Sequence, residues 1–340
     1  MHGEYGIING GFVKRLIIIS CLFLMLIITA IAVANPDRFS VIRPVDYSMV
    51  EGELSPLVIK LNGNIDAVTI ARNKDEVFNI AGIKGKEYLC KTVKLNFGPN
   101  EIVVSALENG RVVESRKVTV FYRADISKEF RLVPPEFQKK LFHREDSERA
   151  CMSCHKTNVS AKDLNPQKPG DSVCYPCHKK ITDYGYVHGP AARWDCLECH
   201  NQNSKPVKYI TQQPERDLCF VCHKDKKEEW TPKKYWHGPT AAGKCSICHN
   251  PHATNNISWL KKPSWDLCVT CHEDRASGRH VIAGFVFGSS HPTKGRPDPI
   301  RPGKELSCAS CHNPHASNSR ALFANDEISP NSLCRMCHKK

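Results

Sequence analysis

One five-residue pattern, Cys-x-x-Cys-His, occurs eight times between Cys151 and His338. The copies use sixteen of the eighteen cysteines in the 340-residue chain. The first cysteines of successive copies are 23, 22, 23, 26, 23, 40 and 26 residues apart. Each copy thus has about 25 residues, whereas a polypeptide below about 40 residues rarely forms a stable core alone. Something other than side chains must therefore supply much of the apolar interior of this region.

Each copy carries the residues that attach a c-type haem. The two cysteines form thioethers with the porphyrin vinyl groups, and the next residue is the proximal histidine of the iron. Structural zinc also uses Cys-x-x-Cys pairs, but it does not require a histidine after every second cysteine. We predict eight covalently bound haem c groups. The attaching cysteines are Cys151, Cys154, Cys174, Cys177, Cys196, Cys199, Cys219, Cys222, Cys245, Cys248, Cys268, Cys271, Cys308, Cys311, Cys334 and Cys337. The proximal histidines are His155, His178, His200, His223, His249, His272, His312 and His338.

A haem c iron also takes a distal ligand, unless that position stays open for substrate. Methionine is scarce, since Met49 is the only one outside the first 34 residues and the haem motifs. Seven histidines, in contrast, lie outside the motifs after residue 142. Histidine on the distal side leaves the potential lower than methionine does. We predict as distal ligands His143, His188, His237, His252, His280, His291 and His315.

The motifs group in pairs. Adjacent motifs form four units, numbered one to four along the chain: 143–178, 188–223, 237–272 and 291–338. In the first three units a histidine stands eight residues before the first cysteine, and in unit four His291 stands 17 residues before Cys308. The first motif of units three and four continues as His-Asn-Pro-His, where units one and two have Asn158 and Asn203.

This pattern resembles the doubled-CxxCH multihaem cytochromes, the class related to cytochrome c3 and to the haem chains of porin–cytochrome conduits. The resemblance covers about 143–340. It implies a wire of closely spaced porphyrins, wrapped in short helices and mostly irregular chain. Each unit is then expected to contact mainly its neighbours.

The histidine count leaves a shortfall. Eight haems require eight distal ligands, and seven spare histidines are present beyond the leader. Exchange between identical chains cannot help, because a ligand given to a neighbour is lost to the donor chain. By register the deficit falls in units one and two, and His280 could fill one vacancy but not both. We therefore expect one haem to be anomalous, at Cys151/Cys154, Cys174/Cys177, Cys196/Cys199 or Cys219/Cys222.

The chain between residues 36 and 124 is of a different kind. Short β-branched apolar runs alternate with turn signals, which predicts β structure. Asn109-Gly110 between 102–107 and 112–122 predicts a hairpin with a tight primed turn. The stretch resembles bacterial immunoglobulin-like sandwich modules, which implies a spacer or docking role. The fold class is thus multidomain, with a small all-β immunoglobulin-like sandwich followed by a haem-dominated cytochrome domain.

Two smaller expectations concern this module. Cys90 is predicted to be a buried free thiol that behaves as a small hydrophobe. Residues 125–142, with Pro134-Pro135, are predicted to be a linker to the octahaem domain at 143–340. Since no predicted ligand precedes His143, the module is expected to be dispensable for haem attachment.

The first 34 residues are predicted to be an export signal or a membrane anchor. Lys14-Arg15 precede an apolar run from Leu16 to Ala34 that ends in small residues. The run is about 19 residues, close to the about 20 that span a bilayer. Cleavage and retention both stay open. Either places the rest of the chain in the periplasm or outside the cell, free or tethered by residues 16–34 to the cytoplasmic membrane.

The formal charge of +13 does not indicate a nucleic-acid partner. From His143 onward there are 29 lysines and arginines against 20 acidic residues, and sixteen haem propionates would offset the excess. No groove-reading motif accompanies the charge. We therefore predict no nucleic-acid partner.

These features favour an electron-transfer protein without catalytic residues. It would pass electrons from another cytochrome or a quinol-linked donor to a downstream periplasmic or extracellular acceptor. One alternative is a reductase or oxidoreductase of a small nitrogen or sulfur oxyanion at one open haem. In such enzymes a lysine often replaces the proximal histidine, and all eight motifs here end in histidine. The other alternative, an oligomer or extracellular cytochrome filament, is left open by the sequence.

Overall fold

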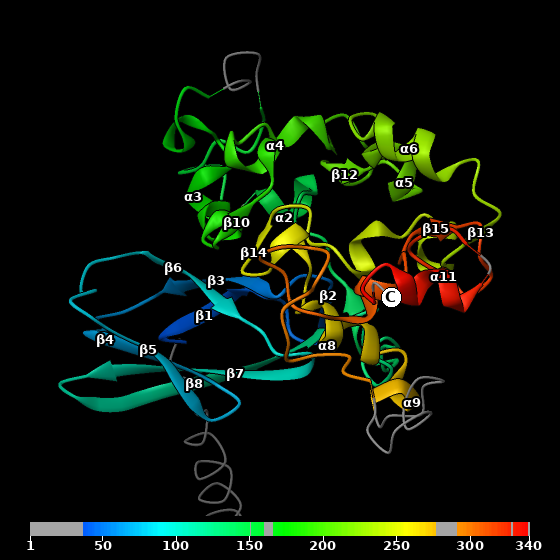
Figure 1. Ribbon diagram of the computed structural model, residues 1–340. Coiled ribbons are helices and arrows are strands. Elements are labelled where there is room, and N and C mark those ends of the chain that lie inside the picture. The colour runs from blue at the N-terminus through cyan, green and yellow to red at the C-terminus, as the bar shows by residue number, and fades with distance from the viewer. Residues whose placement is uncertain (1–36, 150, 160–165, 277–290, 328, 339–340) are drawn as a thin grey trace, which may run out of the picture.

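The computed structural model describes residues 37–149, 151–159, 166–276, 291–327 and 329–338. In Figure 1 a β module (blue to cyan) lies beside the motif-bearing part of the chain (green to red). The predicted leader and His280 lie outside the described residues. Among those that are described, no helix has the length and apolar character needed to cross a membrane.

The β module is built from two sheets. The smaller sheet has the strand order β1–β3–β6, and the larger has the order β5–β4–β7–β8–β2–β9. The strands are β1 (Phe39–Arg43), β2 (Ser48–Val50), β3 (Leu54–Leu61), β4 (Ala67–Arg72), β5 (Asp75–Ala81), β6 (Tyr88–Lys94), β7 (Gly98–Glu108), β8 (Arg111–Tyr122) and β9 (Gln138–Lys139). This confirms the predicted β structure of the region.

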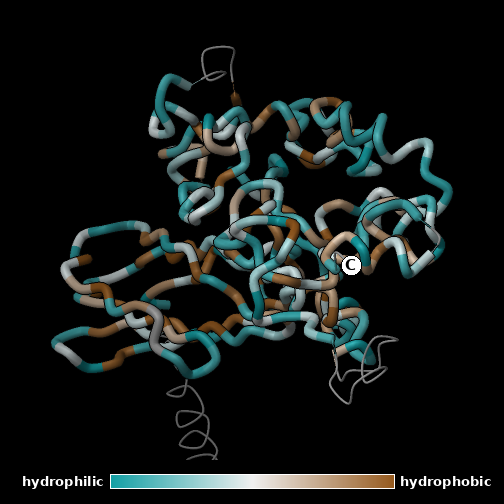
Figure 2. Tube along the Cα trace, viewed as in Figure 1, coloured by the Kyte–Doolittle hydropathy of each residue, from teal (hydrophilic) through white to brown (hydrophobic). Residues whose placement is uncertain are grey.

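The core of the module comes from alternate residues of both sheets. Leu57 and Ile59 of β3 and Ile102 and Val104 of β7 are fully buried, while the residues between them face outward. This period of two follows from the pleat of a strand, which sends successive side chains to opposite faces. Figure 2 shows the hydrophobic residues recurring along these strands.

The predicted hairpin is confirmed. β7 and β8 pair antiparallel with Ile102 opposite Val118, and the turn between them is Asn109-Gly110. Asn109 has φ 50° and Gly110 has φ 73°. Asparagine and glycine accept these left-handed angles better than other residues, which is why this pair suits a two-residue turn.

Residues 125–142, predicted to be a linker, lie against the module. β9 extends the larger sheet by pairing parallel with β2, so that Ser48 faces Gln138. Phe137 packs on Tyr47 and Phe121, with ring centroids 5.5 and 5.3 Å apart. Aromatic packing thus holds this segment against the module close to the start of the motif-bearing region.

Short helices and irregular chain make up the rest, as predicted. The α-helices are α2 (Glu145–Glu148), α3 (Tyr175–His178), α4 (Gly189–Ala192), α5 (Glu215–Cys219), α6 (Lys224–Trp230), α7 (Gly238–Ala241), α8 (Ser264–Val269), α9 (Glu273–Ala276), α10 (Cys308–Cys311) and α11 (Pro330–Arg335). The 3-10 helices are η2 (Pro169–Asp171), η3 (Lys179–Thr182), η4 (Cys196–Glu198), η5 (Cys245–Ile247) and η6 (Ile257–Trp259).

This region has little apolar core of its own. The buried apolar residues of its described part are Trp194, Val207, Ala253, Leu306 and Ala316. The whole cluster of packed core residues in the molecule belongs to the β module instead. The contrast agrees with the expectation that the interior of the motif-bearing region is not made by side chains alone.

Two-residue strands join consecutive units. β10 (Tyr186–Val187), just before unit two, pairs with β14 (Ala253–Thr254) of unit three. β13 (Tyr235–Trp236), just before unit three, pairs with β15 (Ala316–Ser317) of unit four. A third pair, β11 (His200–Asn201) with β12 (Ile210–Thr211), lies within unit two. The backbone before one unit is therefore hydrogen-bonded to the backbone of the next unit.

The module contacts the motif-bearing region directly. The Tyr184 hydroxyl donates a hydrogen bond to Glu53, and the Lys94 ammonium lies 5.8 Å from the Tyr184 ring centroid. Lys128 forms an ion pair of 3.1 Å with Glu273. These contacts join the module to the junction of units one and two and to the end of unit three.

The prediction that Cys90 is buried is wrong. Cys90 is exposed, because β6 directs Leu89 and Val93 into the sandwich and Cys90 to the opposite face. That face looks toward the motif-bearing region, where Cys90 lies near the thiols of Cys151 and Cys177. Cys90 stands between Leu89 and Lys91, and a single cysteine carries no periodic signal that would have shown which face it takes.

Candidate haem-binding sites

Six predicted distal histidines lie opposite six motif histidines. In every pair the imidazole ring centroids are 6.1 or 6.2 Å apart. Five pairs have interplanar angles between 4° and 32°, and the sixth is close to perpendicular at 77°. The pairs are His143–His178, His188–His223, His200–His252, His237–His272, His249–His315 and His291–His338.

The pair spacing fits one metal ion between two imidazoles. A metal–imidazole nitrogen bond is about 2 Å and a ring nitrogen lies about 1 Å from its centroid, so such a pair has centroids about 6 Å apart. No group of three or more histidine, cysteine or acidic side chains is placed to share a metal within the described ranges. Each pair would thus hold one metal ion through two imidazoles, and the other ligands of that ion would come from a group outside the polypeptide. A porphyrin fits this donor set, whereas a structural zinc site, with four protein ligands, does not.

Burial keeps the paired histidines in the form that binds metal. It lowers the pKa of His178, His252 and His315 to about 4 in each case. Only neutral imidazole has a free lone pair for a metal, so these side chains are ready for ligation at neutral pH without losing a proton.

The pairs follow one rule along the chain. We call the histidine that opens each unit its leading histidine, and the second histidine of His-Asn-Pro-His its trailing histidine. Each leading histidine pairs with the second motif of its own unit, as His188 does with His223. Each trailing histidine pairs with the first motif of the preceding unit, as His252 does with His200. Consecutive units therefore share a site.

Units two, three and four hold the first-motif histidine in the same way. In each, its Nδ1 donates to the backbone carbonyl nine residues further on, over 2.8 to 2.9 Å. The acceptors are Tyr209, Ser258 and Ala321. This bond assigns the proton to Nδ1 and leaves Nε2 free to bind a metal, which is the usual arrangement of a ligating histidine.

The polypeptide surrounds a connected hollow of about 3470 Å³. Cysteines and histidines of the first seven motifs line it, together with the outward face of the smaller sheet of the β module. The residues from that sheet include Ile42, Pro56, Val58 and Cys90. Met49 of β2 lines it as well. The β module is thus a wall of the same space as the motifs.

Neighbouring cysteine pairs run through the motifs in chain order. The second motif of one unit and the first motif of the next have thiols close enough to interact, in the pairs Cys174–Cys196, Cys219–Cys245 and Cys268–Cys308. The two motifs of a single unit are close enough for their thiols to interact electrostatically, in the pairs Cys151–Cys177, Cys199–Cys222, Cys248–Cys271 and Cys311–Cys337. The described cysteines are all free of disulfides.

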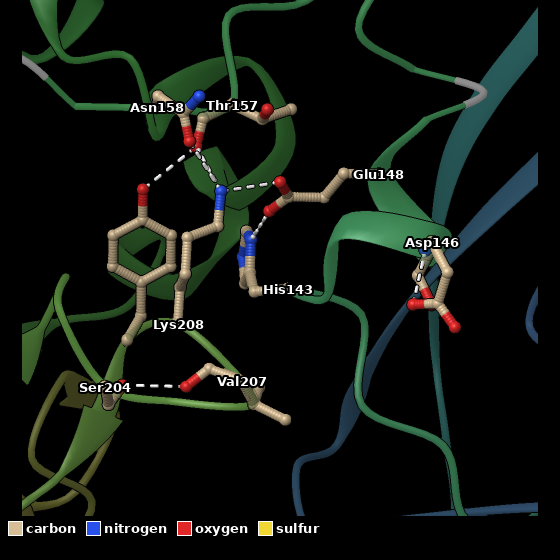
Figure 3. A network of polar contacts seen from close by, with 10 residues as sticks. His143, Asp146, Glu148, Thr157, Asn158, Ser204, Val207 and Lys208 are labelled. Atoms are coloured by element: carbon tan, nitrogen blue, oxygen red, sulfur yellow. Dashed lines mark hydrogen bonds and ion pairs between the residues drawn. The ribbon is translucent and has the colours of Figure 1, made fainter.

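Glu148 is a site residue that the sequence did not indicate. Its side chain is 3% exposed and bridges two partners, His143 Nδ1 at 2.9 Å and Lys208 Nζ at 2.6 Å (Figure 3). Lys208 also donates to Asn158 Oδ1 over 2.7 Å. Burial alone would raise the pKa of Glu148, but the hydrogen bonds from Lys208 and His143 outweigh it and the pKa is lowered.

A weak signal for Glu148 does exist. It stands three residues before Cys151, where unit two has Arg193 and unit three has Ala242. Unit four also has a glutamate there, but Glu305 accepts a hydrogen bond from the Gly295 N–H. Of the leading histidines, His291 has a backbone carbonyl, that of Pro292, within 2.9 Å of its Nδ1. A carboxylate on the leading histidine is therefore a feature of unit one that the repeat pattern does not carry.

Four stretches of the chain match the family model of the doubled CXXCH motif: 143–183, 188–228, 237–277 and 299–340. The chain carries four doubled CXXCH motifs. Such motifs indicate covalently bound c-type haem, and their repetition on one chain indicates a multihaem cytochrome with a role in electron transfer. The four matches coincide with the four units that the histidine pairs connect.

No curated protein sequence matches the chain. Solved structures that match include an FMN-binding β-glucuronidase from Facaelibacterium prausnitzii L2-6, at 16% identity over 31% of this chain and 13% of that one, with a TM-score of 0.21. The fibronectin(III)-like modules of CbhA from Clostridium thermocellum match at 14% identity over 30% and 99%, also with a TM-score of 0.21. Similarity this low carries no argument about function.

Two motif histidines are outside the six pairs, His155 and His312. His312 packs on Phe323, with ring centroids 5.8 Å apart, and its Nδ1 is held by Ala321 as above. No other histidine ring lies against His155 in the described part of the chain. Met49 lies in β2, in register with Phe121 and Lys139.

Proposed function

We propose that this protein is an octahaem c-type cytochrome that relays electrons along haems arranged in chain order. The observation that supports the proposal is the unbroken series of neighbouring cysteine pairs, in which each motif has a thiol near a thiol of the next. Haems attached at such neighbouring cysteines have their edges close together, as electron transfer without bond chemistry requires.

The six histidine pairs support low-potential, bis-histidine haems in this relay. A distal histidine, unlike methionine, leaves the potential of a c-type haem low. The haem irons then only cycle between the ferric and ferrous states. The remaining two haems are those attached at His155 and His312, and His280 is the one spare histidine not yet placed.

The direction of the relay is inferred from its two ends. The motifs of unit one lie beside the β module, which follows the predicted export signal or anchor, and the last motif is the one nearest the carboxyl end. We propose entry from a membrane-side cytochrome or quinol-linked donor near the module and exit to a periplasmic or extracellular acceptor. In that case residues 16–34 direct export, and the immunoglobulin-like module serves as a docking element.

The first test is the number of haems. A pyridine haemochrome assay and the intact mass should give eight haems per chain, and four or fewer would refute the proposal. The electron paramagnetic resonance spectrum of the oxidised protein should be dominated by low-spin haem, since six pairs supply two imidazoles each.

The second test breaks the series. The double variant Cys219→Ser, Cys222→Ser removes the fourth haem, and electrons injected at one end should then reach the other half far more slowly. The control Cys334→Ser, Cys337→Ser removes the terminal haem and shortens the series without dividing it. Equal transfer rates in the two seven-haem variants, measured by rapid-mixing absorbance, would refute a linear relay.

A second candidate function is an oxidoreductase of a small nitrogen or sulfur oxyanion. The specific observation in its favour is His155, against which no second histidine ring packs among the described residues. An iron with one protein ligand can bind a substrate, and a series of seven further haems would then serve it with electrons.

A further inference from the structure

The trailing position of unit two is occupied by Asn203. Three loops show that it matches the trailing histidines of the later units. The residue after the motif histidine is asparagine in each, and its Oδ1 accepts from the backbone N–H two residues on, over 2.9 to 3.0 Å. Those backbone N–H groups belong to Asn203, His252 and His315.

The shared loop gives Asn203 a defined role in the array. His252 and His315 each face the first motif of the preceding unit, at His200 and His249. By the same step, position 203 would face the first motif of unit one, whose histidine is His155. Asparagine is not a usual haem ligand. The six pairs and His155 thus follow from a single rule, with Asn203 as the substitution that breaks it.

Asn158, the other asparagine in this register, has no such consequence. It belongs to unit one, so its partner would be a motif in a unit before His143. Its Oδ1 accepts a hydrogen bond from Lys208 Nζ instead (Figure 3). Asn158 and Asn203 therefore occupy the same register in sequence, but only Asn203 stands where a haem of this chain would take its distal histidine.

We propose that the haem held by Cys151, Cys154 and His155 has an open distal position that binds small iron ligands, and that Asn203 leaves it open. This rests on the proposed bis-histidine relay. The site lies at the β module, where Cys90 is near Cys151 and Cys154. Arg43 brings a positive charge toward Cys151 and lies 5.0 Å from the Phe142 ring centroid. A cation beside the haem favours anionic ligands such as cyanide on the ferric iron.

The test is to supply the missing ligand. In the full-length wild-type protein, the haem at His155 should be high-spin when oxidised, bind cyanide, and bind carbon monoxide when reduced. With His280 counted as the distal ligand of the haem at His312, this is one haem in eight. Asn203→His should abolish all three signals by giving the haem at His155 a distal histidine. The side chain of Asn203 is exposed, so a larger residue can be accommodated. Asn158→His is the matched control and should keep all three signals.

The outcomes separate this inference from the proposed function. A wild-type protein that is fully low-spin and binds no carbon monoxide would overturn the open position. So would an Asn203→His variant that binds carbon monoxide as wild type does. If several haems bind carbon monoxide, the bis-histidine relay itself fails. If Asn203→His loses haem, Asn203→Met offers a second ligand at the same site, and its thioether should raise the potential of one haem.

Discussion

Glu148 is the residue through which the protein acts most directly on one haem site. Its carboxylate accepts a hydrogen bond from His143 Nδ1, and His143 faces His178 in the second motif of unit one. A carboxylate on the far nitrogen of a ligating imidazole makes that ligand more basic. A more basic ligand stabilises ferric iron, so the haem at His178 should have a lower potential than those whose histidines bond to carbonyls.

Replacing Glu148 with glutamine should raise the potential of that haem. Glutamine keeps the hydrogen bond but removes the charge. Changing the hydrogen-bond partner of a metal ligand typically alters the metal affinity or activity of a site by about 10-fold to 100-fold. A tenfold change in a one-electron reduction equilibrium is about 59 mV. A spectroelectrochemical titration that resolves the lowest-potential haem would measure it.

Asp146→Asn is the matched control for this prediction. Asp146 lies on the same short helix, but it is exposed and its partners are Arg144 and Ser147 rather than a histidine (Figure 3). A shift of the same size in both variants would show that the effect is one of overall charge. No shift in Glu148→Gln, with eight haems retained, would refute the role of Glu148.

Among the elements, the two-residue strands between units position the paired histidines more directly than the helices do. His188 N–H donates to the His252 carbonyl and His237 N–H to the His315 carbonyl, both over 2.9 Å. The leading histidines of units two and three are thus each fixed against a trailing histidine of the next unit. Ala253 and Ala316, which follow the trailing histidines, are fully buried. A bulky residue there would separate two haem sites at once, because each ladder positions ligands for both.

The contact of Tyr184 with Glu53 should make docking of the module sensitive to alkaline pH. Burial and the hydrogen bond to Glu53 raise the pKa of Tyr184. The neutral hydroxyl is therefore favoured in the folded state, so the stabilisation is complete below the ordinary tyrosine pKa of about 10 and is lost as the pH rises above it. Limited proteolysis of the 125–142 segment should accelerate above that pH. In Tyr184→Phe the rate should be higher at neutral pH and rise less on alkalinisation; equal pH profiles would contradict the prediction.

Features that depend on local sequence were predictable, and features that depend on contacts between distant residues were not. The motifs and leading histidines are local patterns, so their register marked them as candidates without any structure. The partner of each histidine was not predictable, because pairing depends on which units pack together. Glu148 and Lys208 meet across 60 residues, and no local pattern links them. The side of β6 that Cys90 occupies likewise depends on a neighbour outside the strand.

For the whole molecule, the β module is more than a spacer. Its smaller sheet lines the hollow that the motifs also line, at Pro56, Val58 and Cys90. A chain that begins at Glu136 behind an export signal should still carry eight haems, since all attaching cysteines lie after it. The first haem, however, should become more exposed to solvent and bind cyanide faster. Loss of a haem in the pyridine haemochrome assay would show instead that the module contributes a ligand, with Met49 the first residue to replace.

The spacing of the sites also predicts the shape of the redox titration. Each electron added to one haem removes a positive charge and makes its neighbours harder to reduce. With neighbours on both sides of most sites, reduction should extend over a broad range rather than follow a single one-electron curve. A narrow titration, or a majority of high-potential haems, would contradict the histidine pairing.

The sharing of histidines between units makes the two ends of the array unequal in how it can evolve. A duplicated unit added after residue 338 would bring its own trailing histidine and would require no change in the units already present. A unit added before His143 would depend on position 158, where this chain has asparagine. Lineages that lengthen such a cytochrome should therefore add units at the carboxyl end. The reactive haem should stay in the amino-terminal unit, whatever the number of units.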